Sequence, residues 1–116
     1  ESVTIVKAVG NSANGAVSSS RLGLRNALIA TVGQDQNGTD CLDTLKSNNV
    51  STEYMRVDPN NKTNYHYVLW YTNERTILVK HEKYEYKLPE INVAPKWIYL
   101  SSMGKDSAPI YTEIAA

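Results

Sequence analysis

The chain has 116 residues, enough for one domain or part of one, and its 12 basic and 12 acidic side chains cancel to a net charge of zero. This balance gives no electrostatic reason to expect binding to nucleic acid or to an anionic membrane surface. No apolar run approaches the length of a membrane-spanning segment, so we expect neither a membrane nor a nucleic acid among its partners. The single cysteine, Cys41, has no partner for an internal disulfide, which favours a reducing, cytoplasmic location.

The first predicted elements are a short strand and a helix made of small residues. Apolar side chains at alternate positions predict a strand over 2–9, which Gly10 interrupts. Ser12 is a favourable N-cap for a helix over 13–22, and Gly23 is a favourable stop. Because Gly, Ala and Ser dominate this helix, another backbone or a ligand can approach it closely.

A second strand and a second helix follow. The uninterrupted apolar run 27–32 predicts a strand buried on both faces, as in a parallel sheet. The next helix places Cys41, Leu42 and Leu45 on one face. It is expected to end at Asn48, because Asn tolerates the left-handed conformation. Strand, helix, strand and helix in this order predict an α/β fold with a layered sheet.

The middle of the chain has a different pattern, with aromatic side chains on both faces of its strands. The segments 52–57, 63–71 and 75–80 are separated by turn-forming residues. Together they predict an antiparallel meander. One of its faces is expected to cover a partner or a neighbouring sheet, and the other face a ligand.

The last segment predicts one more strand and one more helix. The apolar run 97–100 favours a strand, and residues that follow a parallel strand often line a ligand site. Ile110 and Ile114 share one face of a helix from Pro109, but no helix-stop residue closes it before Ala116. This pattern predicts that the chain is cut from a longer protein.

The sequence shows no self-contained catalytic set. His66 and His81 lie on different segments without cysteine or acidic partners at ligand spacing, so no metal site is predicted. Cys41 falls in a helix away from both, which argues against a cysteine–histidine nucleophile. Neither a Gly-x-Ser-x-Gly turn nor a Gly-Lys-Ser/Thr phosphate loop is present.

Two features have both a functional and an ordinary structural interpretation. The polar stretch 10–16 lies at a strand-to-helix junction and could bind hydroxyl groups or an anion. Asn and Ser are also common capping residues, so these residues taken alone favour a capping turn. The aromatic meander with Arg75 and Lys80 could bind a ligand, or it could be a twisted sheet face with solvated charges.

The order of these motifs resembles the first signature region of the ribokinase-like (PfkB-type) carbohydrate kinases. The stretch 10–17 is similar to the family's Gly-Gly-x-x-Ala-Asn-x-Ala helix start, 20–24 to its Arg-Leu-Gly helix end, and 33–38 to its Gly-x-Asp-x-x-Gly turn. The similarity continues to 97–102 and covers nearly the whole chain from Lys7. Each motif is weak alone, but their order is specific for the superfamily.

The resemblance implies a fold and a division of the chain. We expect part of the family's three-layer α/β/α sheet in core segments 1–50 and 96–116, and an antiparallel β-meander lid at approximately 51–88. The whole chain, 1–116, would be the N-terminal part of a single kinase domain. In the family such a lid closes over the acceptor substrate and often joins two subunits, which implies a homodimer through the lid.

The resemblance also implies substrate-binding residues. The family's second Gly and its Asn contact sugar hydroxyls, which assigns this role to Gly10 and Asn14, with the neighbouring Asn11 in the same pocket. On the lid, His66 and Lys80 fall where relatives place substrate contacts. Lys80 could meet an acidic or phosphorylated substrate, or it could lie at an exposed strand end.

The sequence departs from the family pattern at three points. Val9 stands in place of the first Gly, and both the opening strand with its substrate-binding Asp and the Gly-x-Gly-Asp segment with the catalytic Asp are missing. The resemblance therefore implies a parent enzyme that uses ATP and Mg²⁺ to phosphorylate a hydroxyl of a sugar, sugar acid or nucleoside, with the cofactor site mostly outside this chain. The fragment alone is expected to be inactive. The alternative is a noncatalytic small-molecule-binding or dimerisation module that uses the aromatic meander.

Overall fold

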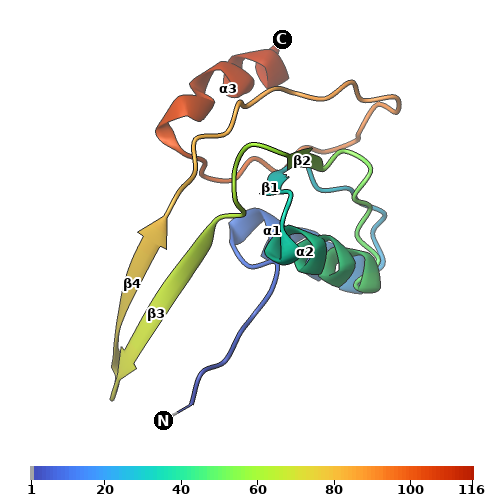
Figure 1. The fold of residues 1–116 in the computed structure, drawn as a ribbon. Helices are drawn as coiled ribbons and strands as arrows, with labels where there is room; N and C mark the ends of the chain where they lie inside the picture. The colour runs from blue at the N-terminus through green and yellow to red at the C-terminus, as the bar shows by residue number, and fades with distance from the viewer. Residues whose placement is uncertain (1) are drawn as a thin grey trace.

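The structure of the chain is a computed structural model that describes residues 2–116 (Figure 1). It combines helices with one short parallel pair and one long antiparallel pair of strands, which confirms the α/β class. In chain order the elements are α1 (Asn11–Arg21), β1 (Thr31–Gly33), α2 (Gln36–Ser47), β2 (Arg56–Asp58), β3 (Tyr65–Tyr71), β4 (Glu74–Lys80), the 3₁₀ turn η1 (Lys105–Ser107) and α3 (Ala108–Ala115).

Helix α1 begins directly after Gly10, whose φ of 113° lies in the region that favours glycine. This conformation turns the extended chain sharply into the helix. At the other end, Gly23 has a φ of 86° and donates its N–H to the Ser20 carbonyl at 2.9 Å. The predicted helix 13–22 is confirmed, but Gly10 rather than Ser12 precedes its first turn.

Helix α2 begins after Asp35, whose carboxylate accepts a hydrogen bond from the Gly38 N–H at 2.8 Å. The helix ends at Ser47, and Asn49 then takes a φ of 59°. Both the helix and its Asn stop agree with the prediction. Leu45 on the inner face is 1 % exposed and is therefore a central core residue.

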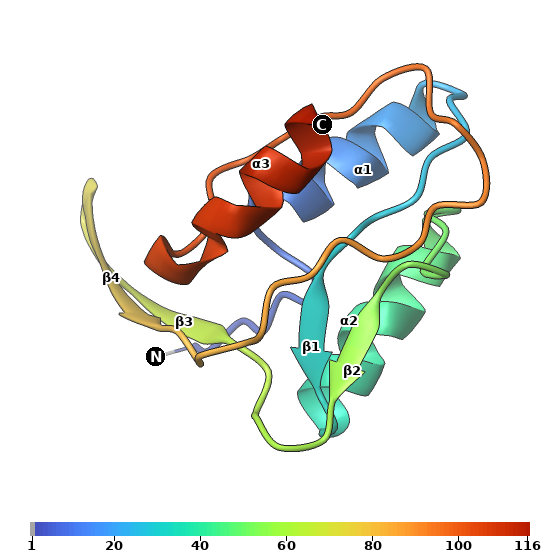
Figure 2. The same ribbon diagram turned by 90° about the horizontal axis from the view of Figure 1, so that it is seen from above.

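Strands β1 and β2 form a parallel pair, in register from Thr31 opposite Arg56 onward. An isolated parallel bridge between Ala27 and Ser51 joins the two segments again nearer their starts, one residue out of the β1–β2 register. Helix α2 connects the two strands, as parallel strands require a crossover of this kind. Figure 2 shows the two strands side by side with α2 beneath them.

Two strand predictions are corrected by this pairing. The strand predicted over 27–32 is shorter and lies at Thr31–Gly33, with a single bridge before it. The segment predicted over 52–57 was expected to join the aromatic strands, but its end forms β2 and pairs with β1. The predicted meander is therefore a two-stranded hairpin of β3 and β4.

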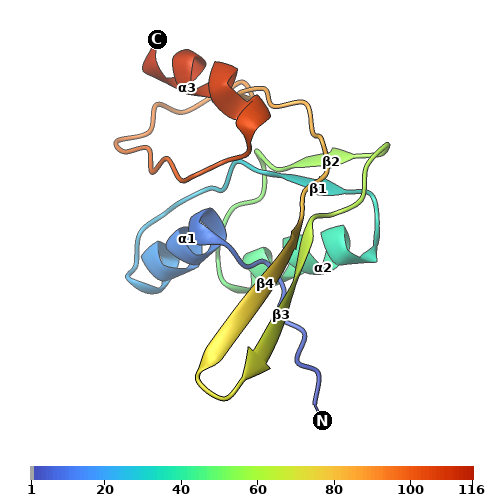
Figure 3. The same cartoon turned by 90° about the vertical axis from the view of Figure 1, so that its left-hand side faces the viewer.

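The core lies between the two long helices and the segments that form the parallel pair. Its buried residues are Ala13 from α1, Leu45 from α2, and Leu28 and Val50 from the loops before β1 and after α2. Figures 1 and 3 show α1 and α2 on one side of the β1–β2 pair and α3 on the other. This arrangement agrees with the expected α/β/α layers, of which the chain forms a part.

The β3–β4 hairpin projects away from this core (Figures 1 and 3). Its register runs from Tyr65 opposite Lys80 to Tyr71 opposite Glu74, and Thr72 in the turn has a φ of 53°. Every residue of both strands is exposed. The hairpin therefore presents apolar side chains on both faces without packing either face against the core.

Two other predicted strands are absent from the described residues. Segment 2–9 is extended but unpaired, with Val3 92 % exposed, and segment 97–100 is likewise unpaired, with Trp97 92 % exposed. A β-strand is stabilised by hydrogen bonds to a neighbouring strand, and residues 2–116 supply no neighbour for either segment. Both segments are extended, as their apolar patterns predict, but the prediction that they form paired strands is wrong for this structure.

A close approach of two backbone segments at Gly33 gives a stability prediction. A Cβ on Gly33 would overlap the backbone of residues 61–63, so Gly33→Ala should lower the free energy of unfolding by about 1–3 kcal/mol. Urea unfolding of the complete gene product, followed by circular dichroism, measures this loss. Gly104→Ala is the control, because its Cβ would meet only the Tyr86 hydroxyl at 3.6 Å, an ordinary contact. Equal losses in the two variants would contradict the prediction.

Candidate functional site

The start of α1 carries three of the residues singled out in the sequence. Gly10 is exposed and turns the chain into the helix, and the Asn14 N–H donates to the Gly10 carbonyl at 2.9 Å. The side chains of Asn11 and Asn14 are exposed. Within residues 2–116 neither amide side chain caps the helix, so the capping role that the residues alone favoured is not what the structure shows. Both amides are free to bind hydroxyl groups.

The small-residue helix α1 is contacted at Gly15 by Tyr99, from the extended segment 97–100. The Tyr99 ring lies so close to Gly15 that a Cβ there would come within 3.3 Å of it. This agrees with the expectation that small residues in α1 permit a close approach. Tyr99 itself remains 72 % exposed, so the contact covers one edge of the ring and leaves the rest open.

A pocket of about 430 Å³ that is lined mainly by polar residues lies at the base of the hairpin. It is open to solvent and forms between the start of α2 and the point where the chain enters and leaves the hairpin. Its lining residues are Asp35, Gln36, Asn37, Lys62, Thr63, Tyr65 and Lys80. It thus contains two lysines, amide side chains and one tyrosine ring, a set that suits hydroxyl or anionic groups.

Lys80 is the one predicted site residue that lines this pocket. Its ammonium lies 2.8 Å from a Glu82 carboxylate oxygen and 5.3 Å from the centre of the Tyr65 ring. The hydrogen bond to Glu82 raises the pKa of Lys80 above its ordinary value of 10.5. Lys80 is therefore a fixed positive charge at the pocket wall, already shared with one carboxylate.

His66 points away from Lys80. Neighbouring residues of a strand face opposite sides, and Lys80 shares the face of its partner Tyr65, whereas His66 shares the face of Val79. The His66 ring instead lies 5.8 Å from the His81 ring in an edge-on arrangement. The structure does not bring His66 and Lys80 to one pocket, and Gly10, Asn11 and Asn14 do not line the hairpin-base pocket either.

Sequence reasoning missed the role of the Asp35 carboxylate. It accepts hydrogen bonds from the Thr63 hydroxyl at 2.6 Å, the Thr63 N–H at 3.0 Å and the Gly38 N–H at 2.8 Å. Burial by itself raises the pKa of Asp35, but the bonds from Thr63 and then from Gly38 outweigh it, and the pKa lies below its ordinary value of 3.8. The Gly-x-Asp-x-x-Gly turn was visible in the sequence, but its bond to Thr63 was not.

The return side of the hairpin base is fixed by a buried tyrosine. Tyr84 is 6 % exposed and donates its hydroxyl hydrogen to the Lys62 carbonyl. Burial raises the pKa of Tyr84 to about 12. At neutral pH its hydroxyl is thus a permanent donor, which ties the chain after β4 to the chain before β3.

The described residues offer no metal centre of their own. Among residues 2–116 no group of three or more His, Cys, Asp or Glu side chains lies close enough to hold a metal ion. A Mg²⁺ ion therefore finds no ligand cluster among these residues. None of the helices described is long and apolar enough to cross a membrane.

Comparison with known proteins places these features in a family. A sequence profile of the pfkB family carbohydrate kinases matches residues 5–114. Among solved structures, a fructokinase from Halothermothrix orenii matches with 36 % identity and a TM-score of 0.57, over 62 % of this chain and 26 % of its own. An uncharacterised sugar kinase from Pyrococcus horikoshii, also solved in complex with ATP, matches with 30 % identity and a TM-score of 0.57, over 61 % of this chain and 25 % or 24 % of its own.

A third structure, the apo fructokinase from Vibrio cholerae, matches with 28 % identity and a TM-score of 0.57, over 63 % of this chain and 26 % of its own. The chain thus spans about a quarter of the length of these kinases. A comparison with curated protein sequences gave no significant match.

The Asp35 contacts predict a change in acid stability. Because the folded-state pKa of Asp35 lies below 3.8, its contribution to stability is full above that value and is lost as pH falls through the folded pKa. Asp35→Asn should therefore make the unfolding free energy fall less between about pH 6 and pH 3 than in the unmodified protein. Urea unfolding at several pH values tests this. Asp43→Asn, which alters an exposed carboxylate on α2, is the control and should show the same pH dependence as the unmodified protein. The same pH dependence in Asp35→Asn would refute the prediction.

Proposed function

Because the chain belongs to the pfkB family of carbohydrate kinases, we propose that it forms the acceptor-binding and lid portion of an ATP-dependent sugar kinase. The complete enzyme would transfer the γ-phosphate of ATP to a hydroxyl group of a sugar, a sugar acid or a nucleoside. The family match over residues 5–114 is the observation that carries this proposal. The similarity to two fructokinases favours a sugar among these acceptors.

The start of α1 is the proposed site for the acceptor. Gly10 has no side chain, so a sugar ring can approach the backbone closely where the helix begins. Asn11 and Asn14 would donate and accept hydrogen bonds with its hydroxyl groups, since each amide offers both functions. Such contacts hold the reacting hydroxyl in place, and positioning supplies a large part of catalysis in phosphoryl transfer.

The phosphate-transfer chemistry requires residues beyond this set. The 116 residues contain no Gly-x-Gly-Asp segment, whose Asp acts as the base in the family, and no Mg²⁺ ligand cluster among the residues described. ATP and Mg²⁺ would therefore bind mostly to other residues of the complete enzyme. We propose that these 116 residues alone bind the acceptor weakly and transfer no phosphate.

The β3–β4 hairpin is the proposed lid. Its Tyr65–Lys80 face borders the pocket at the hairpin base, which supports a role in covering the acceptor. Lys80 would meet an acidic or phosphorylated acceptor if Glu82 releases it, because a lysine ammonium acts as a mobile point charge. His66 lies on the opposite face, so a direct contact to the same acceptor needs a different hairpin position from the one described.

The other hairpin face is the proposed dimer interface. It carries Val68, Trp70, Ile77 and Val79, which are 43 %, 67 %, 46 % and 52 % exposed. Apolar surface of this kind on a sheet that projects from the core is typical of an interaction site. A second copy of the chain is the occupant we propose, because the same face on both copies is self-complementary in a two-fold dimer.

A second candidate function keeps the binding but not the catalysis. The exposed aromatic hairpin alone would suit a noncatalytic small-molecule-binding or dimerisation module. The reading frame that encodes the chain separates the two functions. A Gly-x-Gly-Asp segment encoded in the same frame supports the kinase, and its absence from the gene would favour the module.

We expect the complete gene product to release ADP in an acceptor-dependent manner when assayed with ATP, Mg²⁺ and a panel of sugars, sugar acids and nucleosides. Asn14→Ala should raise the KM for the acceptor about tenfold, the cost of one lost hydrogen bond of about 1.4 kcal/mol. Asn92→Ala, in an exposed loop, is the matched control and should leave KM unchanged. If none of the acceptors caused ADP release, the proposed function would be refuted.

The dimer is predicted to depend on one face of the hairpin only. Replacing Val68 and Trp70 together by serine should weaken self-association at least about tenfold, because hydrophobic anchors dominate such interfaces. Replacing their neighbours Leu69 and Tyr71 by serine, on the opposite face, should leave the dimer intact. Size-exclusion chromatography with light scattering measures both. A monomeric unmodified protein at high concentration, or an equal effect of the two pairs, would count against the interface.

A further inference from the structure

One carboxylate joins the start of a helix to the start of the hairpin. Asp35 accepts from the Gly38 N–H, which fixes the first turn of α2, and from both the N–H and the hydroxyl of Thr63, two residues before β3. The Thr63 hydroxyl in turn accepts from the Gly33 N–H at 2.9 Å. The end of β1, the start of α2 and the entry to the hairpin thus meet at one pair of side chains.

The packing between this pair and the two glycines beside it is tight. Thr63 is 7 % exposed, and both Gly33 and Gly38 are buried. A Cβ on Gly38 would overlap the Gly33 carbonyl and come within 3.0 Å of the Thr63 hydroxyl. The three segments can come this close only because glycine stands at both positions.

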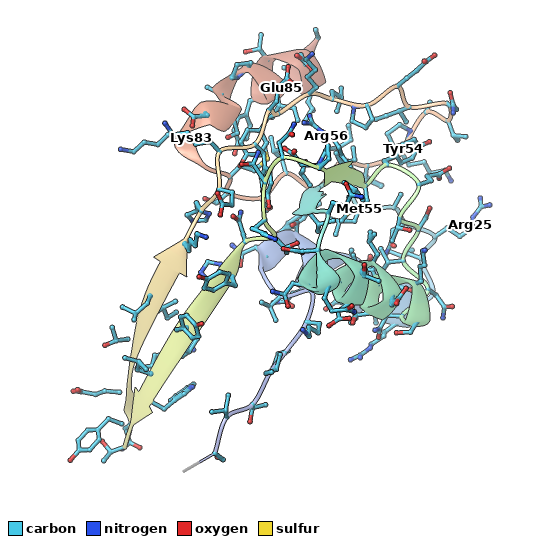
Figure 4. The ribbon with its side chains drawn as sticks, in the orientation of Figure 1. Arg25, Tyr54, Met55, Arg56, Lys83 and Glu85 are labelled. Carbon is cyan, nitrogen blue, oxygen red and sulfur yellow. The ribbon has the colours of Figure 1, made fainter. Side chains whose placement is uncertain are left out.

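The hairpin is held to the core at its base and nowhere along its length. Both strands are exposed throughout, so the attachment rests on the segments just before β3 and just after β4. On the return side, Tyr84 bonds to the Lys62 carbonyl, and Arg56 donates to the Glu85 carbonyl at 2.7 Å. Figure 4 shows Arg56 and Glu85 next to each other where the chain has left β4. On the entry side, the Asp35–Thr63 pair is the corresponding attachment.

We propose that Asp35 and Thr63 are positioning residues that set the angle of the hairpin against the start of α2. The same two residues line the pocket at the hairpin base, so this pair also fixes the width of the pocket. The carboxylate of Asp35 already accepts three hydrogen bonds, which leaves little capacity to bind a ligand itself. This inference goes beyond the proposed function, because it concerns how the hairpin is held, whatever the acceptor.

A distance measurement between the hairpin turn and α2 tests the proposal. In the complete gene product with Cys41→Ser, spin labels at Asn73→Cys in the turn and Lys46→Cys on α2 report the hairpin angle by pulsed electron paramagnetic resonance. Thr63→Val, which removes only the hydroxyl, and Asp35→Asn are each expected to shift or broaden the distance distribution by more than about 2 Å, the scale of a loop rearrangement. Thr63→Ser keeps the hydroxyl and Asp43→Asn alters an exposed carboxylate of the same helix, so both should retain the original distribution.

Circular dichroism and the spin-label distance together distinguish a change in the hairpin angle from a general loss of structure. Circular dichroism should show unchanged helix content in Thr63→Val, and a distance change with intact helices supports the proposal. An unchanged distribution in both variants, or an equal change in Asp43→Asn, would overturn it. If both variants fail to fold, hydrogen exchange in the unmodified protein decides. The Thr63 N–H should then exchange at least about tenfold more slowly than that of Asn73 in the exposed turn, and equal rates would refute the anchor.

A kinetic comparison adds a readout that rests on the proposed function. With an accepted substrate, Thr63→Val should raise the acceptor KM about tenfold with a smaller change in kcat, since the pocket width rather than the chemistry is altered. Thr63→Ser should restore KM. If Thr63→Ser raised KM as much as Thr63→Val does, the positioning role would be contradicted. Lack of activity with every acceptor would refute the proposed function alone, and the distance measurement would still decide this inference.

Discussion

The Asp35 carboxylate is the interaction on which the arrangement of the molecule depends. Its bonds to Gly38 and Thr63 tie the parallel β1–β2 pair, helix α2 and the aromatic hairpin to one point. Hydrogen bonds to an ionised carboxylate are about twice as strong as neutral ones, and here they act in a partly buried setting. The core of Leu28, Leu45 and Val50 supplies the stability of the helical half. The hairpin is attached to that half by polar contacts at its base, with Asp35 on the entry side and Arg56 on the return side.

The hairpin combines two surfaces with different neighbours. Tyr65 and Lys80 face the polar pocket, while Val68 and Trp70 face away from it. The strict alternation of side chains along a strand makes this division unavoidable. The two proposed roles of the hairpin, covering the acceptor and joining a second subunit, therefore fall on opposite faces, and a residue's position in the register decides on which face it lies.

Much of the fold could be predicted from local patterns, and the rest depends on contacts between distant segments. Gly10, Gly23 and Asn49 mark helix ends by backbone conformations that few residues adopt, so α1 and α2 were predictable. The partner of the 52–57 segment was not, because alternation shows that a strand exists but not which strand it joins. Among the site residues, the family resemblance pointed to Lys80, which lines the pocket, but its role as a substrate contact stays a prediction. Sequence reasoning missed Thr63, because a hydroxyl that bonds to a carboxylate 28 positions away leaves no local pattern.

The exposure of both tryptophans has a consequence for spectroscopy. Trp70 lies on the hairpin and is 67 % exposed, and Trp97 lies on an unpaired extended segment and is 92 % exposed. Indole emission shifts to shorter wavelength when water is excluded, so the intrinsic fluorescence of this chain reports what covers these two surfaces and is insensitive to the packing around Leu45. A blue shift on adding a ligand or raising the protein concentration would therefore be an optical signal of closure or association, obtained without any label.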